Sequence, residues 1–257
     1  MMNHKELFAA ATDVALEAGN LIVKIQSKSQ EIKKDGKDFL TEADLASEKL
    51  ILEKLGKLDP AIPFLSEEAG GEPCYQGLQW IVDPVDGTMN YAFGDDTFGV
   101  SIALVEDSNT VFGVINLPRK GLLFSAYRAQ GAWLNGKPVH VSSRSNLARA
   151  RVYMDFPGKA EERAPYMPFY KKISAKTLYP QSRGCVTAGL ADVACGIVDA
   201  YVHVKDAVYD NAAGYLLVQE AGGKATRLNG KEINAFSTDI IASNGILHKE
   251  ILSICSS

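Results

Sequence analysis

The sequence predicts a mixed α/β protein built from two tightly joined subdomains, residues 1–145 and 146–257. The first part opens with two amphipathic patterns of helical period and continues as short apolar runs between turn residues. The second part instead alternates strand and helix patterns. No Gly/Ser-rich or Pro-rich linker separates the two parts, and the change of pattern falls near residues 140–150. A chain of 257 residues can bury a full core without disulfide or metal staples.

Two helices are expected at the start of the chain. Asn3 is placed to cap the first, in which apolar residues recur at steps of three and four. The second helix is expected to begin near Thr41 and to run to about Leu55. Gly56 and a following Asp-Pro pair are expected to stop it.

The middle of the chain predicts a meander of antiparallel strands, because its apolar runs are short and are bounded by turn residues. The expected strands are Ile62–Leu65, Trp80–Val82, Phe98–Val105, Val111–Leu117 and Leu122–Tyr127. A further strand over Ala132–Leu134 is followed by Asn135 and Gly136, a pair typical of a tight hairpin.

Strands and helices alternate in the second part. The expected strands are Val152–Phe156, Ala200–Val204 and Ile240–Ala242, and the expected helices are Thr187–Cys195, Asn211–Glu220 and Leu247–Ile254. Gly222 and Gly223 are expected to end the helix that precedes them, because glycine readily adopts the left-handed conformation found after helix ends.

Charge and targeting signals exclude several classes of function. Lys and Arg number 27 against 31 Asp and Glu, so the formal net charge is −4 and no nucleic-acid partner is expected. No apolar run approaches the length of a membrane helix, and the polar start shows no signal peptide. The four cysteines show no Cys-x-x-Cys spacing, so reduced thiols in the cytoplasm are expected.

Several common catalytic motifs are missing. No two glycines stand two positions apart, which excludes a Gly-x-Gly-x-x-Gly dinucleotide loop. The stretch from Gly131 to Lys137 approaches a P-loop, but Pro138 replaces the required Ser or Thr, and a hairpin explains it better. There is no Gly-x-Ser-x-Gly or His-Glu-x-x-His motif, and the histidines are too scattered to suggest a zinc site.

The most informative stretch is the strand that ends in Asp83-Pro-Val-Asp86-Gly-Thr88. Pro84 fixes the backbone direction and Asp86 with Gly87 turns it, so two carboxylates should be held close together. Backbone N–H groups of the short helical turn that follows can face the same place. Paired carboxylates beside exposed amides suit a divalent cation bridged to a phosphate. The structural alternative is an Asx-turn at the end of a strand.

Four other acidic residues, at three places in the chain, carry a structural alternative of equal or greater weight on their own. Glu67 and Glu68 follow a strand and are compatible with a solvated loop. Asp44 fits the third helical position of a capping box opened by Thr41. Asp210 is compatible with the N-cap of the next helix.

Taken together, these elements resemble the inositol monophosphatase family, which belongs to the magnesium-dependent, lithium-sensitive phosphatases. The matching elements occur in the family's order and span most of the chain: Asp38-x-x-Thr41-x-x-Asp44, Glu67-Glu68, Asp83-Pro-Val-Asp86-Gly-Thr88, Asp210-x-Ala-Ala-Gly214 and Glu220-Ala-Gly-Gly223. The resemblance implies a layered αβαβα sandwich. Residues 1–145 would carry most metal ligands, and residues 146–257 would close the site. It also implies a homodimer.

The resemblance further implies a role for individual residues. Ligands of two Mg²⁺ ions would be Glu67, Asp83, the carbonyl of Val85, Asp86 and Asp210. Catalysis would involve Glu67, with Asp44 and Thr88 orienting the attacking water, and a weaker third ion is possible. Substrate binding would involve Asp86, Gly87, Thr88, His203 and Asp210. Lys33 falls where relatives carry a basic residue near the site.

Elementary electrostatics supports the same chemistry. Two unit charges ~4 Å apart interact by about 4 kcal/mol at an effective dielectric constant near 20, so a phosphate dianion could not enter such an acidic cluster without cations. Hard oxygen ligands favour Mg²⁺, or Mn²⁺, over zinc. No Cys or His stands as a covalent nucleophile, so direct in-line attack on phosphorus by a metal-activated water, without a phosphoenzyme, is expected.

The expected substrate is a small polyol phosphate, with inositol monophosphate the first candidate. Met89-Asn90-Tyr91 is similar to the continuation of inositol-type members, whereas Tyr209 replaces a common Trp. His203 stands where animal inositol enzymes carry a Glu, and it can equally be an ordinary strand histidine. Arg183 can either reach the pocket or lie at the surface. Histidinol phosphate and sugar phosphates stay open as substrates, and a non-catalytic metal- or phosphate-binding regulator is the alternative from another class.

Overall fold

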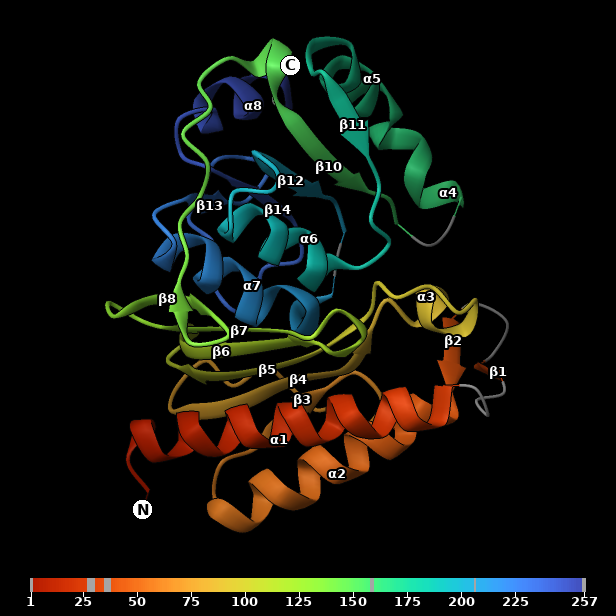
Figure 1. Ribbon diagram of the computed structural model, residues 1–257, viewed down its shortest axis with the longest axis vertical. Helices are drawn as coiled ribbons and strands as arrows, with labels where there is room; N and C mark the ends of the chain where they lie inside the picture. The colour runs from red at the N-terminus through yellow and green to blue at the C-terminus, as the bar shows by residue number, and fades with distance from the viewer. Residues whose placement is uncertain (1, 27–30, 35–37, 158–159, 206, 256–257) are drawn as a thin grey trace.

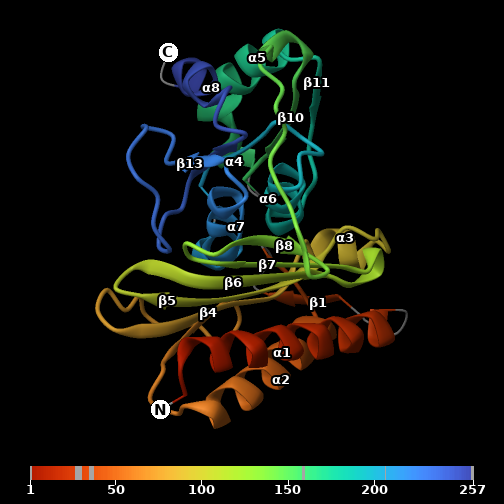
Figure 2. The ribbon, with the colours of Figure 1, turned by 60° about the vertical axis from the view of Figure 1, so that its left-hand side comes forward.

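The protein is a stack of five layers in the computed structural model, which describes residues 2–26, 31–34, 38–157, 160–205 and 207–255. Figure 1 and Figure 2 show the helix pair α1 and α2 on one side of a seven-stranded sheet, and the pair α6 and α7 between this sheet and a five-stranded one. The outer helices α5 and α8 cover the far side of the second sheet. The bounds of these helices are α1 His4–Ile25, α2 Glu42–Leu58, α5 Met167–Lys176, α6 Val186–Ala194, α7 Val208–Glu220 and α8 His248–Cys255. The αβαβα sandwich is therefore confirmed.

The seven-stranded sheet contains the expected antiparallel meander. Its strands lie in chain order: β3 Phe64–Ser66, β4 Leu78–Asp86, β5 Gly99–Glu106, β6 Asn109–Leu117, β7 Leu122–Tyr127, β8 Gly131–Leu134 and β9 Lys137–Pro138. All neighbours are antiparallel except β3 and β4, which are parallel. Asn135 and Gly136 have φ angles of 48° and 76°, as a tight hairpin turn between β8 and β9 requires.

The five-stranded sheet mixes both directions, in the order β11-β10-β12-β14-β13. Its strands are β10 Arg151–Asp155, β11 Tyr179–Gln181, β12 Ala200–His203, β13 Lys224–Thr226 and β14 Ile240–Ser243. β10 is parallel to β11 and β12, whereas β14 is antiparallel to β12 and β13. Three small elements complete the fold: a β1–β2 hairpin with strands Glu31–Lys34 and Asp38–Thr41, and the short helices α3 Thr88–Ala92 and α4 Ala160–Arg163.

The hydrophobic core has one part on each side of the two sheets and one part between them. The part between the sheets joins α6 and α7 to strands of both sheets, so the two parts of the chain share a core. The second part packs α1 and α2 against the seven-stranded sheet, and the third packs α5 and α8 against the five-stranded sheet. This shared middle layer fixes the position of α7 over β4, which brings distant acidic residues together. The boundary at residue 145 stays a prediction.

Some boundaries differ from the sequence-based expectation. α2 continues through Gly56 to Leu58, because Gly56 packs beside Phe64 and the helix ends only at Asp59. β4 extends on both sides of the expected Trp80–Val82 as one buried strand. The β1–β2 hairpin and the helices α4 and α5 were not expected from hydrophobic periodicity, since they are short or mainly polar, whereas α3 is the short helical turn expected after Gly87.

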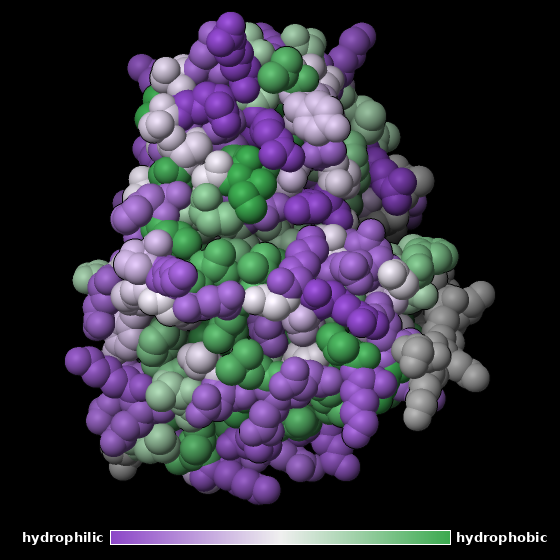
Figure 3. All heavy atoms as spheres, in the orientation of Figure 1, coloured by the Kyte–Doolittle hydropathy of each residue, from purple (hydrophilic) through white to green (hydrophobic). Residues whose placement is uncertain are grey.

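The surface seen in Figure 3 is mixed in character. Hydrophilic residues dominate over α1 and α2, and apolar residues show at the level of the seven-stranded sheet. Among the described residues, no helix combines the length and apolar character that crossing a bilayer requires. All four cysteines are free thiols.

Candidate active site

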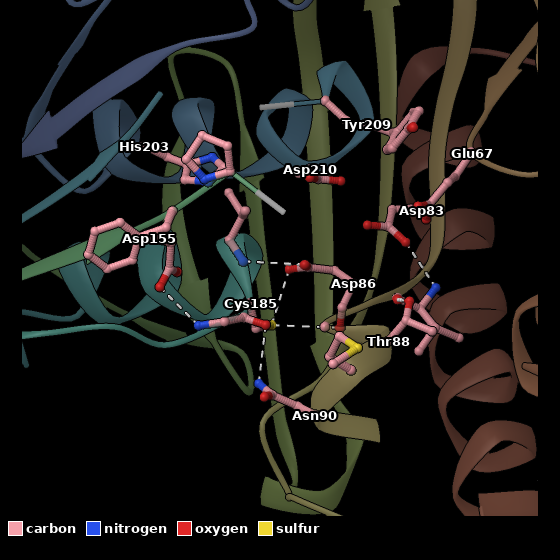
Figure 4. A pocket seen from close by; sticks show the side chains of 18 of the residues that line it. Glu67, Asp83, Asp86, Thr88, Asn90, Asp155, Cys185, His203, Tyr209 and Asp210 are labelled. Atoms are coloured by element: carbon pink, nitrogen blue, oxygen red, sulfur yellow. Dashed lines mark hydrogen bonds between the residues drawn. The ribbon is translucent and has the colours of Figure 1, made fainter. Parts of the chain in front are cut away.

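Three aspartates from two distant segments converge at one place. Asp83 and Asp86 lie at the end of β4, and Asp210 lies in the first turn of α7. One carboxylate oxygen from each falls within 4.8 Å of the others. Figure 4 shows the three side chains on the wall of a pocket of about 490 Å³ between the two sheets. The structure therefore brings together three of the predicted metal ligands.

A bulge at the end of β4 explains how Asp83 and Asp86 share this pocket. Residues three positions apart on a regular strand point to opposite faces of the sheet. Here Asp83 pairs with Ser101 and Asp86 pairs with Gly99, so three steps on β4 match two on β5. The extra residue rotates the strand and turns the second carboxylate to the side of the first. The N–H of Val85 donates to Asp83 Oδ1 at 2.9 Å, so the Asx-turn alternative and the acidic site coexist.

Glu67 is half-buried and Asp83 is buried, and both acids resist ionisation in the absence of a cation. Burial, followed by the nearby carboxylates of Glu68 and Asp44, raises the pKa of Glu67 to about 8. Burial, followed by the charges of Glu67 and Asp86, holds the pKa of Asp83 well above its usual range. A hard divalent cation among these oxygen donors would remove this penalty, so the residues fit a Mg²⁺ or Mn²⁺ site.

Asp44 connects α2 to the start of α3. Its Oδ2 atom accepts hydrogen bonds from the N–H and hydroxyl of Thr41, at 2.8 and 2.6 Å, which confirms the capping box. Its Oδ1 atom accepts from the hydroxyl of Thr88 at 3.2 Å. The same hydroxyl lies 3.0 Å from the carbonyl oxygen of Val85, so its hydrogen has two possible acceptors. Burial raises the pKa of Asp44 to about 6.

Asp86 is held by the beginning of α6. The N–H and hydroxyl of Thr187 donate to its Oδ2 atom at 2.6 and 2.5 Å, and the thiol of Cys185 donates to the same atom at 3.1 Å. Burial and the Asp86 carboxylate raise the pKa of Cys185, so this thiol stays protonated and can donate. The sequence indicated a helix here but gave no sign that Thr187 or Cys185 belongs to the site.

Asp210 is not the N-cap that the sequence suggested. α7 begins at Val208 with Ala207 as its N-cap, so Asp210 is the third helical residue. Acidic residues are favoured at the N-cap and also in the first turn, where they interact favourably with the helix dipole. The two positions are therefore hard to tell apart from the sequence. From this position its carboxylate faces Asp83 and Asp86 instead of closing the helix end.

The far wall of the pocket comes from the second part of the chain. His203, Phe156, Tyr209 and Lys205 line this wall. His203 stands at the end of β12, and its side chain is only 7 % exposed. Lys205 Nζ lies 2.7 Å from a carboxylate oxygen of Glu162, so an ion pair flanks this wall. Gly87 and Thr88 line the opposite wall at the start of α3, which has no side-chain cap.

Asp155 and Asn90 organise the loop that forms one side of the pocket. Asp155 Oδ1 accepts from the hydroxyl of Ser182 and from the N–H groups of Arg183 and Gly184, at 2.5, 2.7 and 2.9 Å. The side-chain amide of Asn90 donates to the carbonyls of Arg183 and Gly184. The roles of Asp155 and Asn90 become visible only in the tertiary structure, because their contacts join segments that lie 27 to 94 positions apart in the sequence.

Arg183, which the sequence left open as a pocket residue, is not among the described residues that line the pocket. Arg183 pairs with Asp192 at 2.7 Å and its guanidinium lies over the ring of Tyr153. Lys33 stands in β1 and Asp38 begins β2, and the side chains of both lie outside the described residues.

An αβαβα sandwich with a buried acidic cluster at the end of β4 defines a class of metal-dependent phosphatases. Residues 3–257 match the family model described as the inositol monophosphatase family, and the chain belongs to that family. The match covers all of the acidic residues described above.

Individual relatives carry two kinds of name. The chain is 34% identical over 227 residues to a fructose-1,6-bisphosphatase/inositol-1-monophosphatase of Thermotoga maritima, covering 86% of this chain and 84% of the relative. It is also 34% identical over 248 residues to the Nus factor SuhB of Escherichia coli K12, covering 95% and 93%. The solved extragenic suppressor protein suhB of Bartonella henselae superposes with a TM-score of 0.91 at 30% identity, covering 98% of this chain and 99% of that one.

Proposed function

We propose that this protein is a Mg²⁺-dependent phosphomonoesterase that hydrolyses a small polyol phosphate, with inositol monophosphate as the first candidate. The observation that carries the proposal is the approach of Asp83, Asp86 and Asp210 to within 4.8 Å in a pocket. Three carboxylates this close together can all be ionised only if a cation opposes their repulsion. Membership of the phosphatase family supports the same conclusion.

The proposed metal ligands are the side chains of Glu67, Asp83, Asp86 and Asp210 and the carbonyl oxygen of Val85. When bound, two or three Mg²⁺ ions would neutralise the phosphate charge and lower the pKa of water. The protein's own part is to hold these oxygens in place. The bulge fixes two of them, the first turn of α7 fixes a third, and the turn after β3 fixes Glu67.

The proposed reaction is an in-line displacement without a phosphoenzyme. A water oxygen forms the new bond to phosphorus while the bond to the alcohol oxygen breaks, and the products are inorganic phosphate and the free polyol. Thr88, whose hydroxyl donates to Asp44, can accept a hydrogen from this water and thereby orient it. Glu67 is the base that takes the water's proton. The N–H groups of Gly87 and Thr88 at the start of α3 hold the phosphate oxygens.

The leaving alcohol would occupy the wall formed by His203, Tyr209 and Phe156. A histidine ring can donate to or accept from a polyol hydroxyl, whereas a carboxylate at this place can only accept. This wall therefore suits a neutral polyol and also leaves room for a sugar phosphate or histidinol phosphate. The double name of the Thermotoga relative favours testing fructose 1,6-bisphosphate beside inositol monophosphate.

A second candidate function is that of a regulator that binds a partner instead of turning over a substrate. The name of the Escherichia coli relative, a Nus factor, is the observation that favours it. The expectation of no nucleic-acid partner therefore stays a prediction, as do lithium inhibition, a homodimer and a cytoplasmic location.

A phosphate-release screen with Mg²⁺ separates these possibilities. The panel holds inositol monophosphate, histidinol phosphate, fructose 1,6-bisphosphate and adenosine bisphosphate, with EDTA as the metal-free control. We expect Mg²⁺-dependent release from inositol monophosphate, and inhibition by Li⁺. A protein that binds Mg²⁺ and phosphate esters but hydrolyses none of the panel would support the regulator.

A further inference from the structure

One face of α2 carries three polar side chains that are buried against the site. Asp44 and Ser47 are fully buried and Glu48 is 7 % exposed. Positions i, i+3 and i+4 lie on the same face of a helix. Each of the three contacts a different segment that carries proposed site residues. Asp44 accepts from Thr88, and the hydroxyl of Ser47 donates to the carbonyl of Pro84 at 2.9 Å.

Glu48 holds the turn that carries Glu67. A single oxygen, Glu48 Oε1, accepts from the hydroxyl of Ser66 at 2.5 Å and from the N–H groups of Glu68 and Ala69 at 3.1 and 2.9 Å. Both neighbours of Glu67 in the chain are therefore fastened to α2. The turn is closed by two backbone hydrogen bonds between Ser66 and Gly70, at 2.9 and 3.0 Å.

Glu67 is held by its backbone and by a hydrogen bond between its side chain and Asp83. Its N–H donates to the carbonyl of Val82 at 3.3 Å, and its side chain lines the pocket. The direction of the side chain follows from the conformation of the turn, which Glu48 and β4 set together. A shift of the turn would move the carboxylate of Glu67 away from Asp83.

The burial of the Glu48 carboxylate costs free energy, and packing alone gives no reason for an acid at this position. A buried carboxylate loses its hydration, and an alanine at this position would avoid that loss. Hydrogen bonds to a charged acceptor are roughly twice as strong as neutral ones, and three donors from the turn converge on one carboxylate oxygen here. The benefit of the contact is thus the fixed geometry of residues 66 to 69.

We infer that Glu48 is a positioning residue, which acts through the turn of residues 66 to 69 to place the Glu67 carboxylate in the metal site. The inference rests on the proposed function, because Glu67 is there a metal ligand. Residues that orient metal ligands typically change metal affinity or activity by about 10–100-fold when they are removed. Within the described part of the chain, Glu48 accepts its hydrogen bonds from Ser66, Glu68 and Ala69 and from no proposed ligand side chain, so it is not itself catalytic.

The test compares Glu48→Ala with Glu53→Gln as the matched control, because Glu53 stands on the same helix, is exposed and pairs with Lys49 at the surface. Binding of Mn²⁺ is measured by calorimetry, and the Mg²⁺ concentration for half-maximal phosphate release is measured in parallel. Glu48→Ala should lower the affinity for Mn²⁺ and raise the Mg²⁺ concentration for half-maximal release, each by roughly 10-fold or more. Glu53→Gln should change neither quantity. Glu48→Gln keeps an oxygen acceptor and should restore most of the affinity.

The outcomes separate a positioning role from a structural one. If Glu48→Ala lowers the melting temperature but binds Mn²⁺ like the wild type, the inference is wrong. If Glu48→Ala does not fold, Ser66→Ala removes one of the three donors, and wild-type Mn²⁺ affinity in that variant would equally contradict the inference. A wild-type protein that bound no Mn²⁺ would overturn the proposed function and this assignment together.

Discussion

Thr187 donates both its backbone N–H and its hydroxyl to one oxygen of Asp86, at 2.6 and 2.5 Å. This double contact joins the first residues of α6 to the end of β4, although the two lie 101 positions apart. It occupies Oδ2 and thereby fixes the plane of the carboxylate. The orientation of a proposed metal ligand thus depends on a residue outside every recognisable motif.

Replacing Thr187 by Val should weaken metal binding while preserving the shape of the side chain. The variant deletes the hydroxyl donor but keeps the N–H, so we expect a roughly 10-fold loss of Mg²⁺ affinity. Activity titrations with Mg²⁺ measure this loss. Thr187→Ser keeps the hydroxyl and serves as the rescue. Equal metal dependence in Thr187→Val and Thr187→Ser would show that the hydroxyl has no such role.

Replacing Asp83 by Asn should abolish turnover and leave the fold intact. The amide oxygen can still accept from the N–H of Val85, so the local turn survives. Loss of a buried acid whose pKa is held high by burial also removes a repulsion in the metal-free protein. We expect phosphate release to fall at least about 100-fold and Mg²⁺ to lose its effect on the melting temperature. Wild-type turnover in the variant would refute the assignment of Asp83.

His248 should make the protein less stable in acid. Burial, with a smaller contribution from Lys224, lowers its pKa from 6.5 to about 4. Its two ring nitrogens lie 2.9 Å from the hydroxyls of Thr226 and Ser243. Because the unfolded chain binds this proton more readily, stability is complete above pH 6.5 and falls as the pH drops toward 4.

Urea unfolding between pH 7 and 4 measures this loss. We expect His248 to contribute on the order of 1–2 kcal/mol once solvent screening is allowed for. His248→Gln should flatten that part of the pH dependence, whereas His140→Gln, at an exposed position, should not. An unchanged slope in His248→Gln would contradict the prediction.

Two glycines should respond in opposite directions to alanine. A Cβ atom on Gly113 of β6 would lie 2.7 Å from the Cα atom of Ala213 in α7, so the helix would have to move. We expect Gly113→Ala to cost about 1–3 kcal/mol and to weaken metal binding, because α7 carries Asp210. Gly56→Ala in α2 meets Phe64 only at 3.7 Å and should stabilise by about 0.5–1 kcal/mol. Chemical denaturation of both variants checks the pair.

The layered fold could be anticipated because its long elements carry strong periodic patterns. α1 and the strands from β5 to β7 follow directly from apolar spacing and turn residues. The hairpin β1–β2 and the helices α4 and α5 could not be found in this way, because short or polar elements depend on what they pack against. Asp210 was assigned to the N-cap for a related reason. Its place in the first helical turn depends on where α7 begins, and the local sequence pattern does not fix that residue.

The sequence by itself determined the nature of the site. The spacing of Asp83, Asp86 and Thr88 is enough to predict a turn with paired carboxylates. Only the tertiary structure decided which distant groups meet these carboxylates. Thr187, Glu48 and Asn90 act through contacts between segments far apart along the chain. Such contacts arise from the packing of helices on sheets. A single sequence shows which residues are hydrophobic but not which residues they will contact.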